Sequence, residues 1–125
     1  MLLRTGYDRH YVAACRESVG AAVEELRRVG GGSAVWNQLV VGLDGWFSLR
    51  NPKVEGRDGN PINEVRVLAE SVTEHGAVMT VPRGIKLRPE ASVLGFEEGE
   101  EISLDGDAFE RLFDAFLAEV EAKYC

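Results

Sequence analysis

The apolar residues of the segment 107–124 recur at steps of three and four, and this spacing constrains the fold more than any other feature. The positions are Phe109, Leu112, Phe113, Phe116, Leu117, Val120 and Tyr124. Residues at such steps share one face of an α-helix, which a globular protein buries against neighbouring elements. Asp107 and Glu110 have the spacing of a capping box, so we expect them to cap the start of this helix.

Two other parts of the chain show the same helical spacing. The first is the segment 8–29, which three glycines follow. Its apolar face begins just before it at Tyr7 and continues with Tyr11, Cys15, Val19, Val23 and Leu26. Glycine loses much conformational freedom in a helix, so the glycine run is expected to end it. Asn60 and Pro61 then predict another helix start, a capping side chain before a first-turn proline. Gly76 is expected to end that helix.

The segment 33–47 is apolar on most of its sides and allows two interpretations. Its apolar residues are Val35, Trp36, Leu39, Val40, Leu43, Trp46 and Phe47. A helix this apolar would be central in the fold, and Ser33 is placed to cap it. The alternative is a hairpin, because Asp44-Gly45 between apolar runs is a turn signal. For residues 39–47 we prefer the helix to the hairpin.

From residue 77 the pattern changes to short runs that resemble strands. The runs are 77–81, 85–87, 92–94 and 102–104. Pro82 and the glycines near residues 95–99 separate them, as turns separate strands. We therefore expect a small antiparallel β-patch between the third and fourth helices. The predicted fold class is α+β, mainly α, with about four helices in a single domain of residues 1–125.

The net charge of -7 is distributed unevenly. Residues 1–60 carry eight Lys/Arg against seven Asp/Glu, a balance of +1, whereas residues 61–125 carry six against fourteen, a balance of -8. Binding to a phosphate backbone depends on protein cations, so we expect no nucleic-acid partner. The simplest interpretation of the acidic half is a solvated face that keeps the protein soluble, and the alternative is a docking face for a basic partner.

Location is predicted from what the sequence does not contain. It has no run of about 18 apolar residues, the length that a membrane helix needs, so no membrane partner is expected. The first residues lack the apolar region of a signal peptide. Cys15 and Cys125 are expected to be free thiols, as is usual in a chain that is not exported. We therefore expect the cytoplasm.

Sequence motifs of catalysis and cofactor binding are missing. The chain contains no phosphate-binding glycine loop, no dinucleotide fingerprint, no nucleophile elbow and no HExxH motif. Its only histidines are His10 and His75, and neither has the paired spacing of zinc ligands. We therefore expect no metal and no cofactor. We interpret Cys15 as a small buried side chain. Whether the protein is an enzyme stays open, with the balance against it.

The densest mixture of functional residue types lies between residues 36 and 57. The candidate ligand-binding residues are Trp36, Asn37, Asp44, Trp46, Arg50, Lys53 and Arg57. One interpretation is a groove in which a tryptophan forms an apolar wall and the cations attract an anionic ligand. The other, which we favour, is that the tryptophans are core, Asn37 lies on an exposed stripe and residues 50–60 are a connector.

One stretch has a motif in common with a known family. Thr80-Val81-Pro82-Arg83-Gly84-Ile85, with Leu94-Gly95 and Gly99-Glu100-Glu101-Ile102 later, resembles the AbrB-type domain of transcription factors and antitoxins. The resemblance covers residues 80–102 and implies swapped β-hairpins and DNA binding. The chain departs from the family because the stretch before Leu94 is longer and the surroundings are acidic where the family is basic.

These observations give a leading function and two alternatives. The lack of catalytic motifs and the many aromatic residues predict a non-enzymatic protein-interaction module that self-associates, as a homodimer, or binds another protein. The aromatic residues are Tyr7, Tyr11, Trp36, Trp46, Phe47 and the phenylalanines of residues 109–116. The alternatives are a binder of anionic small molecules or an enzyme that uses residues 36–57, and an AbrB-like DNA-binding regulator or antitoxin.

Overall fold

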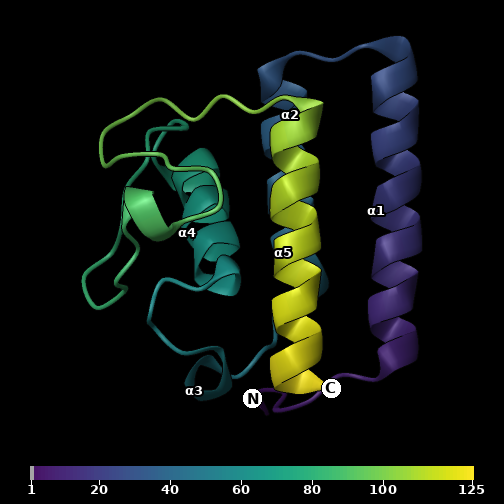
Figure 1. The fold of residues 1–125 in the computed structure, drawn as a ribbon, viewed down its shortest axis with the longest axis vertical. Coiled ribbons are helices and arrows are strands. Elements are labelled where there is room, and N and C mark those ends of the chain that lie inside the picture. Colours follow the sequence, from purple (N-terminus) through teal and green to yellow (C-terminus); the bar gives the residue numbers. More distant parts are fainter. Residues whose placement is uncertain (1) are drawn as a thin grey trace.

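The fold is known from a computed structural model that describes residues 2–125, and these residues form five α-helices and one 3₁₀ turn (Figure 1). The elements are α1 (Arg9–Val29), α2 (Ser33–Trp46), α3 (Pro52–Glu55), α4 (Pro61–Glu74), η1 (Pro89–Ala91) and α5 (Gly106–Tyr124). The prediction of a mainly helical chain is confirmed. Because α2 continues through Gly42 and Gly45, the helix preferred over the hairpin is also confirmed.

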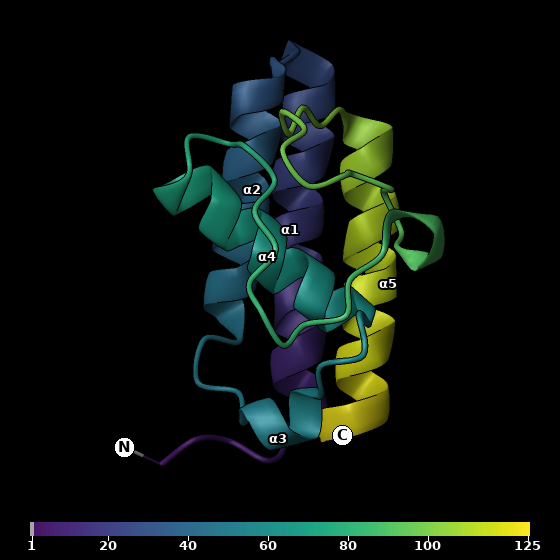
Figure 2. The ribbon, with the colours of Figure 1, turned by 90° about the vertical axis from the view of Figure 1, so that its left-hand side faces the viewer.

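Helix α5 occupies the centre of the arrangement and contacts α1, α2, α3 and α4. Of the four long helices, α1, α2 and α5 run side by side, and α4 crosses the face formed by α2 and α5 (Figures 1 and 2). Both ends of the described chain lie at the same end of the molecule (Figure 1). There the Tyr7 amide donates a hydrogen bond of 2.9 Å to the Tyr124 carbonyl.

Side chains cap three of the four long helices. Asp8 accepts from the His10 amide at 2.7 Å, and Asn60 accepts from two amides of the first turn of α4, as predicted. The predicted cap of the last helix is wrong by two residues, because Asp105 accepts from the Ala108 amide at 2.8 Å. The predicted Ser33 cap is also wrong, since Gly32 occupies the cap position without a side-chain bond.

The capping-box residues of the last helix pair with α1 instead. Arg27 donates from Nη2 to Asp107 at 2.8 Å and from Nε to Glu110 at 3.2 Å. Both carboxylates therefore join α5 to α1, and the cap of α5 is supplied by Asp105.

The core is the shared apolar side of the four long helices. Its largest fully buried apolar side chains are Phe47, Phe109, Phe116, Leu43, Ile62, Leu68, Ile102, Leu112 and Leu117. Phe47 and Phe116 meet with ring centroids 5.7 Å apart, which joins the end of α2 to the middle of α5. Within residues 2–125, no helix combines the length and the apolar character that spanning a bilayer requires.

The predicted antiparallel β-patch is wrong, and with it the predicted α+β fold class, because the described residues form helices and no sheet. Residues 77–104 contain no β-strand and instead form an extended loop with the short η1 turn. A single antiparallel bridge joins Val78 to Glu101, and Met79 exchanges hydrogen bonds with residues 99 and 100. The hairpins implied by the AbrB resemblance are therefore also not found in this part of the described chain.

Side chains of α4 accept hydrogen bonds from backbone amides of the 77–104 loop. In a sheet, a neighbouring strand would bind these amides. The Ser71 hydroxyl accepts from the Thr80 amide at 3.0 Å. The buried Glu64 carboxylate accepts from the amides of Val93 and Leu94 at 2.8 and 2.9 Å. Because buried amides need only one good partner each, the loop packs on α4 without pairing as a sheet.

Candidate functional site

The guanidinium of Arg50 lies inside the protein, with a side chain that is 1% exposed. Its Nε donates to Glu55 at 2.8 Å, its Nη2 donates to Asp44 Oδ1 at 2.7 Å, and its Nη1 donates to the Phe47 carbonyl at 3.0 Å. These bonds join the end of α2 to α3. Arg50, one of the candidate ligand-binding cations, is therefore occupied by internal partners.

Glu55 is the centre of this buried network. Its Oε1 accepts from Arg66 Nη2 at 2.6 Å as well as from Arg50, and its Oε2 accepts from Asn63 Nδ2 at 2.8 Å. Burial acts to raise the pKa of Glu55, but the hydrogen bonds from Arg66 and the charges of both arginines outweigh it and hold that pKa below its usual value. No signal in the sequence marks Glu55, Asn63 and Arg66 as partners, because no local spacing relates α3 to α4.

Trp36 and Asn37 lie in the interior. Trp36 packs against Phe109 with ring centroids 6.0 Å apart. Asn37 donates to the Ile102 carbonyl at 2.9 Å and accepts from the Leu104 amide at 3.2 Å. The expectation that Asn37 lies on an exposed stripe is wrong, because this amide fixes the chain as it enters α5.

The seven candidate residues do not converge on one cavity. Lys53 and Arg57 are exposed at α3 and just after it, whereas Arg50 and Asn37 are buried. Among the seven, only Trp46 lines the pocket between the end of α2 and the start of α1, and Arg57 lines a different cleft. The proposed grouping therefore divides into a structural part and two separate surfaces.

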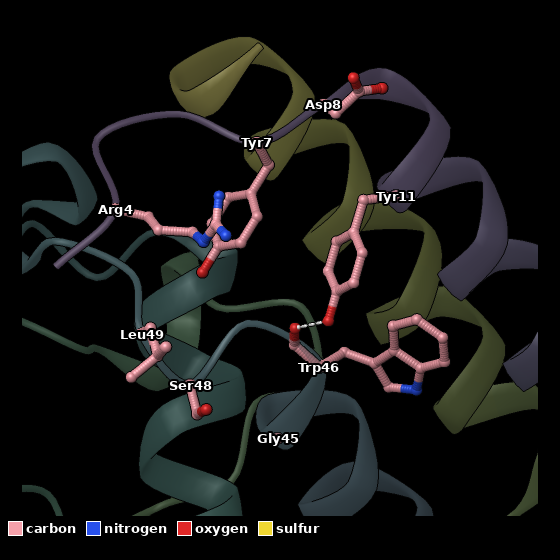
Figure 3. Close-up of a pocket in the computed structure, with 8 residues that line it drawn as sticks. All are labelled: Arg4, Tyr7, Asp8, Tyr11, Gly45, Trp46, Ser48 and Leu49. Atoms are coloured by element: carbon pink, nitrogen blue, oxygen red, sulfur yellow. Dashed lines mark hydrogen bonds between the residues drawn. The ribbon is translucent and has the colours of Figure 1, made fainter. Parts of the chain in front are cut away.

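An aromatic pocket of about 390 Å³ lies where the end of α2 meets the start of α1 (Figure 3). It is lined by Arg4, Tyr7, Asp8, Tyr11, Gly45, Trp46, Ser48 and Leu49. The Tyr7 and Tyr11 rings stack with centroids 5.7 Å apart, and the Tyr11 and Trp46 rings lie 5.4 Å apart. The Tyr11 hydroxyl donates to the Trp46 carbonyl, which holds the rings in place.

Backbone bonds fix the N-terminal wall of the aromatic pocket. The Arg4 amide donates to the Leu49 carbonyl at 2.7 Å, and the Asn51 amide donates to the Arg4 carbonyl at 2.8 Å. The Arg4 guanidinium lies 5.7 Å from the centre of the Tyr7 ring. Within the described chain the buried Tyr7 hydroxyl has no hydrogen-bond partner, and burial raises the pKa of Tyr7.

One face of α2 continues from the aromatic pocket along the helix, and we call it the α2 face. It comprises Val35, Gln38, Leu39, Gly42, Gly45 and Trp46, which fall on one side of a helix of 3.6 residues per turn. Over Ser33–Trp46, all of which the structure describes, the sole charged residue is Asp44, and it pairs with Arg50. The α2 face is consequently exposed in part but uncharged.

Most of the exposed large apolar side chains belong to the first half of the chain. The large ones within residues 2–125 are Leu2, Leu3, Tyr11, Val29, Val35, Leu49 and Val78. All except Val78 belong to the N-terminal segment, to α1, to α2 or to the turn after α2. Scattered apolar residues are normal on protein surfaces. Of these side chains, Val35 lies on the α2 face, and Tyr11 and Leu49 line the aromatic pocket beside it.

Two features bear on catalysis and metal binding. Glu70, Glu74 and His75 place one ligand atom each within 4.8 Å of one another, the one such group found among the described residues, and all three are exposed. An exposed group of this kind on a helix end does not by itself define a metal site. Burial raises the pKa of the Cys15 thiol to about 12, so this cysteine stays protonated and is a poor nucleophile.

Comparisons of the chain with protein-family models, with curated proteins and with solved structures found no match.

Proposed function

We propose that this protein is a non-enzymatic interaction module that forms a homodimer through the α2 face and the neighbouring rings of the aromatic pocket. The observation that carries the proposal is an exposed helix face that has two glycines and no charged residue.

The two glycines are not required by the fold of a single chain. A Cβ atom added at Gly42 or Gly45 would meet no other atom within 4 Å, and neither residue has a positive φ. Glycine within a helix costs about 0.5–1 kcal/mol relative to alanine. Close approach of a second backbone to α2 would account for two such residues on one exposed face.

Charge favours a second copy of the chain as the partner. The protein carries a net charge of -7, and the exposed acids of the 97–101 segment and of α5 would repel one another if those faces met. The α2 face avoids this cost because the face itself carries no charged residue.

The shape of the surface is suited to a two-fold interface. Tyr11 and Trp46 border a very shallow hollow, open to solvent, that Gly42 and Gly45 also line. A two-fold axis places the same patch on both partners, so a ridge beside a hollow can fit its own copy. The exposed apolar residues that flank the hollow would be buried in the same contact.

Sedimentation equilibrium under reducing conditions tests the proposal. We expect a species of twice the 13.7 kDa chain mass at micromolar concentration. Gly42→Glu should give a monomer, because it puts a charge into the interface while its side chain enters open space in the single chain. Ala118→Glu, an exposed helical position on α5, is the matched control and should leave the dimer intact.

The outcomes separate the proposal from its alternatives. A 13.7 kDa species of the unchanged protein over the whole concentration range would exclude the homodimer. Equal loss of the dimer in both variants would show that it forms through another face. Reducing agent is included because Cys125 is exposed and could cross-link chains.

The free state of both cysteines also supports the cytoplasm as the expected location.

A further inference from the structure

Three arginines line a second cleft, which shares no residue with the α2 face or the aromatic pocket. The cleft has a volume of about 250 Å³ and lies between α3 and the segment 82–85. Its lining residues are Pro52, Glu55, Gly56, Arg57, Arg66, Pro82, Arg83 and Ile85. We call it the arginine cleft.

The charges of the arginine cleft are not balanced by its own residues. Glu55 is its one acidic lining residue, and this carboxylate is already bound by Arg50 and Arg66. Within the part of the chain that the structure describes, no carboxylate lies within 4.0 Å of the nitrogens of Arg57 or Arg83. Two uncompensated cations therefore converge in a protein of net charge -7.

Backbone contacts hold the two walls of the arginine cleft together. The Lys86 amide donates to the Arg57 carbonyl at 2.9 Å. Gly59 has a φ of +85°, and a Cβ there would lie 2.4 Å from the Lys86 carbonyl oxygen, so only glycine allows this approach. A Cβ at Gly84 would lie 3.5 Å from Arg57 Nη1, which places that guanidinium against the loop that carries Arg83.

We propose that the arginine cleft binds a small oxyanion of the phosphate type. Guanidinium groups present several N–H donors in a plane and bind phosphate oxygens in pairs, and a dianion would offset the uncompensated charge. The volume of about 250 Å³ is below the 300–1,000 Å³ that is typical of drug-sized ligands, so the cleft suits a phosphate or pyrophosphate group. Arg66 is held by Glu55 as a fixed wall, whereas Arg57 and Arg83 contact the anion.

Isothermal titration calorimetry with pyrophosphate, at constant ionic strength and without metal, tests this site. The variant Arg57→Ala/Arg83→Ala should bind at least about tenfold more weakly than the unchanged protein. Both side chains are exposed, so the variant is expected to fold. Arg9→Ala/Arg28→Ala removes the same charge from exposed positions of α1 and should keep the affinity within about twofold.

Further arms identify the anion. Inorganic phosphate should compete with pyrophosphate, and citrate should compete more weakly if the cleft selects phosphate over carboxylate groups. The proposal is wrong if pyrophosphate gives no binding heat at millimolar concentration. It is also wrong if the α1 double variant loses as much affinity as the cleft variant, since binding would then follow net charge alone.

Discussion

The guanidinium of Arg50 and those of Arg57 and Arg83 carry the same charge in opposite surroundings. Arg50 is buried and has an oxygen partner for each of its nitrogens. Arg57 and Arg83 are exposed, and no carboxylate of the described chain lies within salt-bridge distance of them. The first arrangement stabilises a loop, whereas the second leaves donors free for a ligand.

Arg50→Ala should therefore destabilise the protein strongly. Removing one partner of a buried ion pair leaves the other uncompensated, which costs about 3–5 kcal/mol. We expect this loss in the free energy of unfolding from urea denaturation. Lys53→Ala, a neighbouring cation on the exposed side of α3, is the control and should change the free energy little. A loss below about 1 kcal/mol for Arg50→Ala would contradict the structural role.

The two cysteines should differ in reactivity. Cys15 is fully buried with a pKa of about 12, and Cys125 is exposed. A thiol-specific disulfide reagent at pH 8 should modify one thiol per native chain and two per chain in denaturant. The variant Cys125→Ser should show no rapid modification until it unfolds. Fast reaction of that variant in native buffer would mean that α1 opens locally.

At the scale of the elements, α3 is too short to be stable alone and is held by its contacts. Its four residues are fixed by the Glu55 network, which reaches α2 through Arg50 and α4 through Arg66. Short helices are unstable in isolation because nucleation is costly. The ion pairs therefore determine where the chain lies between α2 and α4.

The Glu55 network should make stability depend on pH in one direction. The pKa of Glu55 is lower in the folded protein, so its stabilisation is present above the unfolded value of about 4.3 and is lost as pH falls through the folded pKa. Glu55→Gln should cost about 3–5 kcal/mol at pH 7. The difference from the unchanged protein should shrink as pH falls below about 4.3.

Denaturation curves of both proteins between pH 7 and pH 3 provide the measurement. Glu64 contributes in the opposite sense, because burial raises its pKa and its stabilisation is lost as pH rises. Both proteins contain Glu64, so its effect cancels in the difference. A difference that stays constant over the whole range would contradict the assignment to Glu55.

Local signals predicted the helices but not the loop after α4. Asn60 with Pro61, and the apolar spacing before Tyr124, depend on residues a few positions apart, and α4 and α5 lie where they predict. The segment 77–104 depends on Glu64 and Ser71, whose side chains bind its amides across 9 to 30 positions. No periodicity reports such partners, so the β-like composition was misleading.

The candidate site was predictable only in part, for the same reason. Trp46 and Arg57 could be recognised as surface groups of functional type, and the structure places each at a cavity. Arg83 and Tyr11 complete those cavities from 26 and 35 positions away. Only the packing of α1 and of the 82–85 segment brings them there.

For the whole molecule, charge is distributed unevenly over the surface. The α2 face is uncharged, whereas exposed acids are concentrated at residues 97–101, in the loop before α5. We expect no micromolar binding to duplex DNA in an anisotropy titration at low salt, because the net charge of -7 opposes a polyanion. Duplex binding that weakens steeply with added salt would contradict this expectation.

The position of α5 has a consequence for the order in which the chain becomes structured. This helix contacts all four others, and Lys123 and Tyr124 donate to the carbonyls of Glu55 and Asn51 at 2.8 Å. Without residues 106–124, the apolar sides of α1, α2 and α4 that pack on α5 stay uncovered. Complete folding therefore requires this segment, and a nascent chain stalled before it should be bound by chaperones that recognise exposed apolar surface.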